Sequence, residues 1–169
     1  MDTLSSRLLV VLEDSELADS TAALGVALAA RLTVPVTFVS CVEPLHIEGG
    51  SPELLLATDS RSEEEERAQV APIFERALQR AAQANVAADT ALTLDKEPAA
   101  AIRELVAQRQ CAMIVVGSHG HGTLMRAITG SLVKDLIRTS PVPVLVCRAD
   151  MFVDAPSGTL RAPGPAGPA

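Results

Sequence analysis

Apolar and polar positions divide the chain into blocks that predict strands and helices in regular succession. Segments rich in apolar positions between the strands show helical spacing, while short continuous apolar runs are typical of strands buried on both faces. Strands that alternate with helices predict a parallel, doubly wound sheet with right-handed crossovers. The predicted strands are 8–12, 34–42, 90–94, 112–116 and 144–147, and the predicted helices are 20–30, 62–85, one from Pro98, and 131–139.

Glycine, proline and polar clusters refine these elements. Gly25 is unfavourable inside a helix, which indicates close packing of that helix against the sheet. Residues 43–59 contain two prolines and two glycines and predict a long loop. Ser62 and Glu65 then form a capping box, and the adjoining glutamates fit a solvated first helical turn better than a cation site. Pro72 is expected to bend or break the helix that follows.

The last part of the sequence differs from the rest in composition. Residues 155–169 are mostly Pro, Gly, Ala and Ser, with too little apolar surface to offset the entropy of ordering. We therefore expect a single folded domain over residues 1–148 and a largely disordered C-terminal tail over residues 149–169.

Composition and charge exclude several classes of protein. A net charge of -7, no Trp or Tyr and only three Phe argue against binding to DNA or RNA. Three cysteines without a CxxC pair indicate a reducing compartment. The chain shows no apolar stretch of membrane-spanning length and no signal-peptide pattern, so a cytoplasmic location without membrane insertion is expected.

The strongest chemical signal is a glycine-bearing stretch between the fourth strand and the last helix. Gly117 and Gly120 follow the strand, and Gly130 precedes Ser131. Strand, glycine loop and helix is the order that places backbone N–H groups around an anion, which predicts a nucleotide phosphate site. The alternative is that the glycines are only turns and the start of a helix.

Two histidines in this stretch are candidate metal ligands. His119 and His121 flank Gly120 but lack the further partners that a zinc site needs, so they are better interpreted as loop residues, with His119 a candidate phosphate contact. Arg126 and Lys134 are candidates for screening phosphate charge, with a plain surface position as the alternative. In doubly wound sheets the ligand lies beyond the carboxyl ends of the strands at the switch point. The first and fourth strands must therefore be neighbours.

The spacing Gly117-x2-Gly120-x9-Gly130-Ser131 resembles the nucleotide motif of the universal stress protein family, ATP-binding branch, over roughly residues 5–148. This resemblance implies a three-layer sandwich with a five-stranded parallel sheet, Rossmann-like and similar to the adenine nucleotide alpha hydrolases. It also implies ATP binding, dimerisation through the last strand, and a role in stress survival or regulation of partner proteins. The flanking segments that share the resemblance are 8–15, 97–102 and 140–146.

The resemblance also implies roles for individual residues. The three glycines let the backbone approach the ribose and the triphosphate, and Ser131 caps the helix while offering its hydroxyl and N–H to a phosphate or to Mg²⁺. The backbone of Val42 reads the adenine edge. Glu13 stands where the family usually has Asp, and a helix-capping role for it is an equal alternative. The full implied nucleotide set is Glu13, Val42, Gly117, Ser118, His119, Gly120, Gly130, Ser131 and Leu132.

Three functions remain open at this stage. The leading one is an ATP-binding regulator, in which the nucleotide orders the 43–59 loop and the glycine loop and alters a partner surface. A slow ATPase is the second, although the sequence has no Walker A lysine motif and no obvious base with an orienting partner. A nucleotide-free dimeric scaffold is the third. Pro143 suits the start of an edge strand, so a homodimer through Val144 to Cys147 is expected.

Overall fold

The computed structural model describes residues 7–13, 17–42, 52–95, 97–118 and 126–148, and the predicted tail (149–169) lies outside this part. None of the described helices is long and apolar enough to cross a membrane. In chain order the elements are β1 (Arg7–Val11), α1 (Leu17–Leu32), β2 (Val36–Val42), α2 (Pro52–Gln83), β3 (Ala88–Leu94), α3 (Pro98–Gln108), β4 (Cys111–Ser118), α4 (Arg126–Thr139) and β5 (Val144–Arg148).

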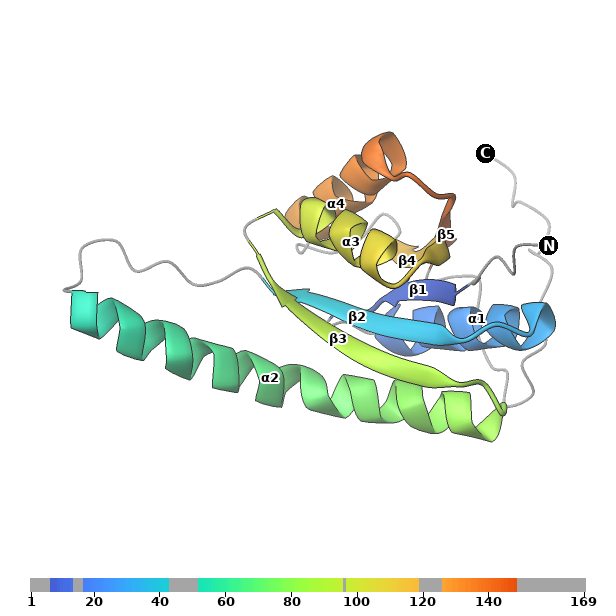
Figure 1. The fold of residues 1–169 in the computed structure, drawn as a ribbon, viewed down its shortest axis with the longest axis horizontal. Coiled ribbons are helices and arrows are strands. Elements are labelled where there is room, and N and C mark those ends of the chain that lie inside the picture. Colours follow the sequence, from blue (N-terminus) through green and yellow to red (C-terminus); the bar gives the residue numbers. More distant parts are fainter. Residues whose placement is uncertain (1–6, 14–16, 43–51, 96, 119–125, 149–169) are drawn as a thin grey trace, which may run out of the picture.

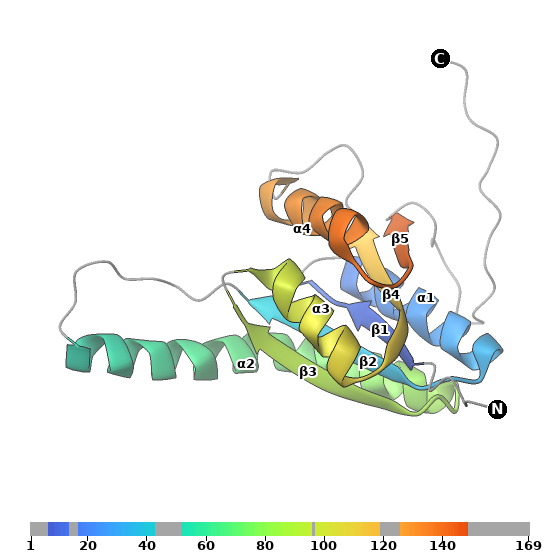
Figure 2. The same ribbon diagram turned by 45° about the horizontal axis from the view of Figure 1, so that its top comes forward.

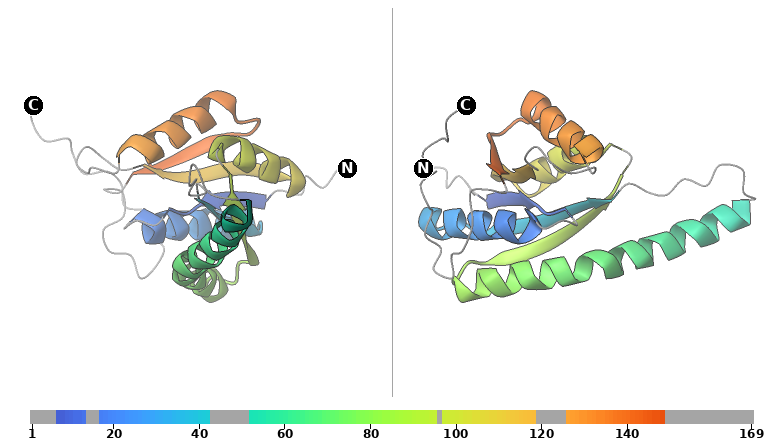
Figure 3. Two further views of the ribbon diagram at one scale, coloured as in Figure 1. Left: turned by 90° about the vertical axis from the view of Figure 1, so that its left-hand side faces the viewer. Right: turned by 180° about the vertical axis from the view of Figure 1, so that it is seen from behind.

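The five strands form one parallel sheet in the order β3-β2-β1-β4-β5. Helices α1 and α2 cover one face and α3 and α4 the other, so the molecule has three layers (Figures 1 and 3). β1 and β4 are direct neighbours, with Val11 opposite Val116. The chain therefore reverses its direction of winding between these two strands, as the predicted site requires.

The core lies on both faces of the sheet because successive strand side chains point to opposite sides. Leu8 and Val10 of β1 pack with Phe38 under α1 and α2, whereas Leu9 and Val11 pack under α3 and α4. Each such buried side chain contributes roughly 1.5–3 kcal/mol. Continuous apolar runs in β1 and β4 are thus explained by burial on both sides.

Gly25 confirms the predicted close approach of helix and sheet. A Cβ at this position of α1 would lie 2.4 Å from Cγ2 of Val10 in β1, which is closer than real carbon atoms pack. Glycine therefore lets α1 lie directly on the central strand, and this packing offsets its poor helix propensity.

Helix α2 corrects two predictions. It begins at Pro52, so residues 52–59 are helical and do not belong to the loop that was predicted over residues 43–59. Ser62 lies inside the helix and therefore cannot be its N-cap. Pro52 suits a first helical position and the residues after it are mostly good helix formers, while residues 43–51 lie outside the described residues.

Pro72 does not break α2, which is one continuous helix that extends beyond the sheet (Figures 1 and 2). Proline removes the hydrogen bond to the carbonyl of Ala68, but both residues lie on the exposed side of the helix. Water can reach that carbonyl, which explains how the helix tolerates the proline.

A charged network closes the amino edge of the sheet on the α3 side. Asp89 of β3 accepts hydrogen bonds from Arg7 of β1 (2.6 Å), from the Thr37 hydroxyl of β2 (2.6 Å) and from Arg109 after α3 (3.1 Å). Arg7 also donates to the Thr37 hydroxyl at 2.7 Å. Burial alone would raise the pKa of Asp89, but the Thr37 and Arg7 hydrogen bonds and the two arginine charges lower it overall.

Candidate functional site

The predicted site residues of β1, β2 and β4 lie at one edge of the sheet. Val11 is opposite both Val39 and Val116, so Glu13, Val42 and Ser118 all follow at the carboxyl ends of adjacent strands. The structure thus brings these three positions to the carboxyl edge of the sheet, with Glu13 and Ser118 on the two strands of the switch point and Val42 on the next strand.

The pKa of the Cys41 thiol depends on the charges at this edge of the sheet. Its thiol lies on the α3 side of β2, and the Thr93 hydroxyl of β3 donates to its sulfur at 3.0 Å. Burial raises the pKa of Cys41 to about 11; the Thr93 hydrogen bond opposes the rise, and the charges of Glu13 and Asp95 add to it. The negative charges of Glu13 and Asp95 therefore both reach the Cys41 thiol at the carboxyl edge of the sheet.

Gly117 has a packing role that the sequence did not indicate. A Cβ at Gly117 would lie 2.7 Å from the Thr21 hydroxyl oxygen and 3.5 Å from Cβ of Leu17, both in the first turns of α1. Thr21 is itself buried. The absent side chain at Gly117 therefore makes room for α1 on that face of the sheet.

Helix α4 corrects the predicted role of Ser131 as a cap. The helix begins at Arg126, five residues earlier than predicted, so Gly130 and Ser131 lie within its second turn. The residues between Arg126 and Gly130 are compatible with helix, and a single glycine is tolerated there. Leu132 is largely buried in the core and shows only a small part of its side chain, whereas Ser131 is exposed.

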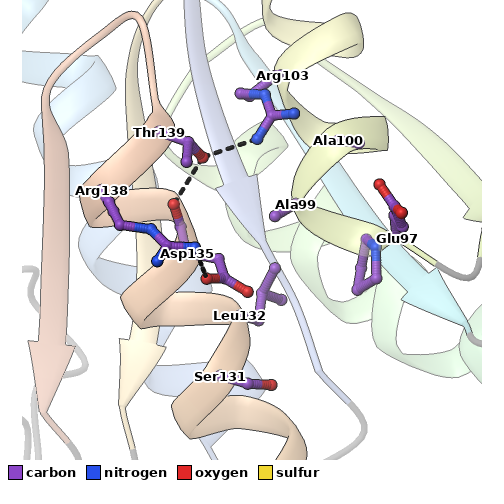
Figure 4. A pocket seen from close by; sticks show the side chains of 10 residues that line it. Glu97, Ala99, Ala100, Arg103, Ser131, Leu132, Asp135, Arg138 and Thr139 are labelled. Carbon is purple, nitrogen blue, oxygen red and sulfur yellow. Dashed lines mark hydrogen bonds and ion pairs between the residues drawn. The ribbon is translucent and has the colours of Figure 1, made fainter.

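A groove of about 530 Å³ separates α3 from α4 (Figure 4). Ser131 lies at one end of it, and at the other end Arg103 of α3 donates to the Thr139 hydroxyl of α4 at 2.7 Å. Asp135 lies between them and accepts from Arg138 at 3.0 Å. Ser131 and Leu132 are thus the residues that the predicted nucleotide set and this groove share.

The end of β2 is tied to β3 and to the start of α3. The Asp95 N–H donates to the Val42 carbonyl at 3.3 Å, and the Asp95 carboxylate accepts from the N–H of Glu97 at 2.9 Å. Glu97 is the N-cap residue of α3 and lines the groove. Val42, whose main chain the resemblance assigns to adenine, therefore already accepts a hydrogen bond from β3 through its carbonyl.

Several predicted positions lie outside the described residues, namely His119, Gly120 and His121, and the Arg126 side chain is not described. Lys134 is exposed on α4. No group of three or more metal-ligating side chains occurs among the residues that are described.

Sequence reasoning missed Asp95, Thr93 and Thr21. The signal for Asp95 was present, because an Asp two residues before Glu97 and three before Pro98 is a common way to start a helix. Thr21 and Thr93 gave no such signal, since only the folded sheet brings them to Gly117 and Cys41.

Comparison with known proteins identifies the family. The model of the universal stress protein family matches residues 5–148. The chain belongs to the universal stress protein family. A search of curated proteins finds no significant match to this member of the family.

Solved universal stress proteins share the fold at low identity. A protein of this family from Burkholderia pseudomallei is 23% identical and superposes with a TM-score of 0.60, covering 87% of this chain and 98% of its own. UspA from Lactobacillus plantarum is 20% identical with a TM-score of 0.65, covering 87% and 100%. A protein from Archaeoglobus fulgidus in complex with dAMP is 18% identical with a TM-score of 0.56, covering 83% and 96%. Other structures of similar fold were solved with cAMP and with AMP bound.

Proposed function

We propose that this universal stress protein binds ATP with Mg²⁺ beyond the carboxyl ends of β1, β2 and β4. The observation that carries the proposal is the adjacency of β1 and β4 at the switch point, where the Gly117-x2-Gly120-x9-Gly130-Ser131 stretch leaves the sheet. Complexes of relatives with dAMP, cAMP and AMP support an adenine nucleotide as the ligand.

In this arrangement the base lies at the end of β2 and the phosphates lie toward α4. The main chain at Val42 reads the adenine edge, Glu13 accepts from the ribose, and Ser131 offers its hydroxyl to a phosphate or to Mg²⁺. Ser118, His119, Gly120, Gly130 and Leu132 complete the proposed contacts. Because Glu13 and Asp95 place negative charge at this edge, a triphosphate needs a cation, which favours MgATP over the free nucleotide.

The proposed role is that of a nucleotide-dependent regulator in a stress response, acting in the cytoplasm through protein partners. The first alternative is an enzyme that hydrolyses ATP slowly, and the second is a dimeric scaffold that binds no nucleotide. Phosphate release at about 1–100 per second, as in kinases, would favour an enzyme, whereas bound nucleotide with little release would favour a regulator.

The test begins with the nucleotide content of freshly purified protein, released by denaturation and separated by chromatography. Titration calorimetry with MgATP then compares two substitutions. Gly120→Val falls on the Gly-x2-Gly-x9-Gly spacing and is expected to abolish binding, whereas Gly122→Val falls outside this spacing and serves as the matched control. Equal binding by both variants, or no binding by the parent protein, would refute the proposed site.

We also propose a homodimer through β5. This strand pairs only with β4, so its other edge is open within the described sheet, and Leu145 is 37% exposed. An apolar open edge is a pairing surface. Light scattering at micromolar concentration should give a dimeric mass, and Leu145→Lys should lower it; a monomeric parent protein would refute the dimer.

A further inference from the structure

We infer that residues 151–155 of the C-terminal tail pair with the outer edge of β5 as an antiparallel strand and compete there with a second copy of the chain. The strand pairing does not depend on the proposed function, whereas the competition rests on the proposed homodimer. β5 pairs only with β4 in the described sheet, so one row of its main-chain groups lies outside that ladder. Such an edge is a template for a further strand.

The register of β4 and β5 determines which main-chain groups face outward. Val144 is opposite Ile114, and the Ile114 N–H donates to the carbonyl of Pro143 at 3.0 Å. In a parallel ladder the odd-numbered residues of β5 therefore bond to β4, and the N–H and C=O groups of Val144, Val146 and Arg148 point to the outer edge. The last residue of β5 can thus exchange hydrogen bonds with an added strand.

The sequence that follows β5 fits this pattern. In a hairpin with a two-residue loop, the residues on either side of the loop exchange both hydrogen bonds with each other. A loop of residues 149–150 makes residues 148 and 151 that pair, in agreement with the outward direction of Arg148. The pairing then runs as far as Val144 and Ala155, and it stops at Pro143 and Pro156, which have no N–H.

The apolar side chains of the tail match those at this edge. Cys147 of β5 points to the α1 side of the sheet, and so does Leu145, which is 37% exposed. In the hairpin register Phe152 is opposite Cys147 on that face, where its ring reaches Leu145 diagonally. Val153 is opposite Val146, on the face that α3 and α4 cover.

Ile137 of α4 lies beside this second face. One side of α4 lines the groove toward α3 and Leu136 is buried beneath the helix, so Ile137 is on the side turned away from α3. α4 lies along β5 at the border of the sheet (Figures 2 and 3). Ile137 and Leu145 are two of the three exposed large apolar side chains among the described residues, and they flank the edge that the tail covers in this register.

The closure of the edge is expected to be reversible. Asp150 is a common turn residue, but Ala149 is not one of the residues preferred in a two-residue hairpin loop. A strand of five residues also buries few side chains to offset the entropy of ordering it. The tail and a second copy are therefore alternative occupants of one edge, and the tail limits the fraction of molecules that can dimerise.

Two double cysteine variants of the full chain test the register. Leu145→Cys with Asp154→Cys places both sulfurs on one face in a non-hydrogen-bonded pair, whose Cα separation of about 4.5 Å suits a disulfide. Leu145→Cys with Val153→Cys is the matched control, because residue 153 points to the other face. Under mild oxidation the first variant should form the disulfide within one chain about tenfold faster than the control, as measured by peptide mass mapping. Equal rates, or mainly disulfide-linked dimers, would overturn the strand pairing.

Hydrogen exchange distinguishes the tail from a second copy. In the parent protein, diluted until it is monomeric, the Val144 and Val146 amides should be protected from exchange. Phe152→Asp should remove this protection, because a charged side chain does not pack on Leu145. Leu160→Asp adds the same charge beyond Pro156 and should keep the protection. Protection that appears only as the dimer forms would contradict the inference.

The competition predicts an effect on dimerisation. Phe152→Asp should lower the dissociation constant of the dimer about tenfold, because the edge becomes available in both subunits, whereas Leu160→Asp should leave it unchanged. Analytical ultracentrifugation measures both. A dimer that is no tighter in Phe152→Asp than in the parent overturns the competition. A monomeric parent protein overturns the proposed homodimer and the competition with it, whereas the disulfide and exchange results still decide the strand pairing.

Discussion

The two edges of the sheet are built differently. At the amino edge, the connections from helix to strand are short, and three of them contain a residue with positive φ, namely Thr33, Asn85 and Gln110. At the carboxyl edge, the connections 43–51 and 119–125 are longer. Short turns fix the geometry of the amino edge, whereas the longer connections give the carboxyl edge chain length with which to enclose a ligand.

The two edges also differ in how their carboxylates are paired. Asp89 at the amino edge is paired with Arg7 and Arg109, whereas Asp95 and Glu97 at the carboxyl edge make no ion pair with any residue that is described. Charged side chains thus link neighbouring strands at the amino edge, whereas the carboxylate at the end of β3 accepts from the N–H of Glu97 and holds the start of a helix.

The largest expected effect tests whether Gly117 belongs to the fold or to the site. Gly117→Ala should destabilise the protein by roughly 1–3 kcal/mol, because the new Cβ meets the Thr21 hydroxyl. Urea unfolding measures the loss. The double variant with Thr21→Ala should recover part of the stability, since the clashing oxygen is gone. If the second substitution adds to the loss instead, Gly117 is not held by this contact.

The amino-edge network should give the next largest effect. Asp89→Asn leaves Arg7 and Arg109 facing a neutral amide, and we expect a loss of about 1 kcal/mol, reduced by solvent because the Asp89 side chain is 39% exposed. Chemical unfolding measures it. Asp19→Asn is the matched control, since its pair with Arg76 is more exposed and should contribute less. Equal losses would mean that burial of the network does not matter.

The pH dependence of stability should reveal the same network. The pKa of Asp89 is below its ordinary value of 3.8 in the folded protein, so its contribution is fully present above about pH 4. It is lost as the pH falls through the folded pKa, because protonation removes the charge that the arginines hold. The difference in unfolding free energy between the parent and Asp89→Asn should therefore shrink as the pH falls toward the lower folded pKa. A constant difference would contradict the lowered pKa.

Sequence patterns predicted most of the strands and helices well because buried segments carry a local apolar pattern. The apolar runs of β1 and β4 and the helical spacing around Gly25 are local signals, and the strand ends differ from prediction by at most two residues. β3 begins at Ala88 because Ala88 and Asp89 pair with β2, which no local pattern shows. The predicted start of α2 at residue 62 was wrong, because the prolines and glycines before that residue favoured a loop.

The site could be predicted only in part. The predicted site required β1 and β4 to be neighbours, and the strand order confirms this. The ligand contacts of the glycine-bearing stretch stay a prediction. The Asp89 network joins residues up to 82 positions apart. The hydrogen bond from the Asp95 N–H to the Val42 carbonyl depends on the register of β2 and β3, so neither feature is visible in the sequence. Gly117 shows a further difficulty, because one glycine can serve both packing against α1 and access of a ligand.

The smallest expected effect concerns the carboxyl edge itself. The charge of Glu13 contributes to the raised pKa of Cys41 after burial and the Thr93 hydrogen bond, so Glu13→Gln should lower that pKa slightly. The pH profile of Cys41 alkylation by iodoacetamide, followed by peptide mass mapping, should then move to lower pH, since the thiolate is the reactive form. Glu104→Gln, on the exposed part of α3, is the control and should leave the profile unchanged. An unshifted profile in Glu13→Gln would place this carboxylate away from Cys41 and from the ribose position that we assign to it.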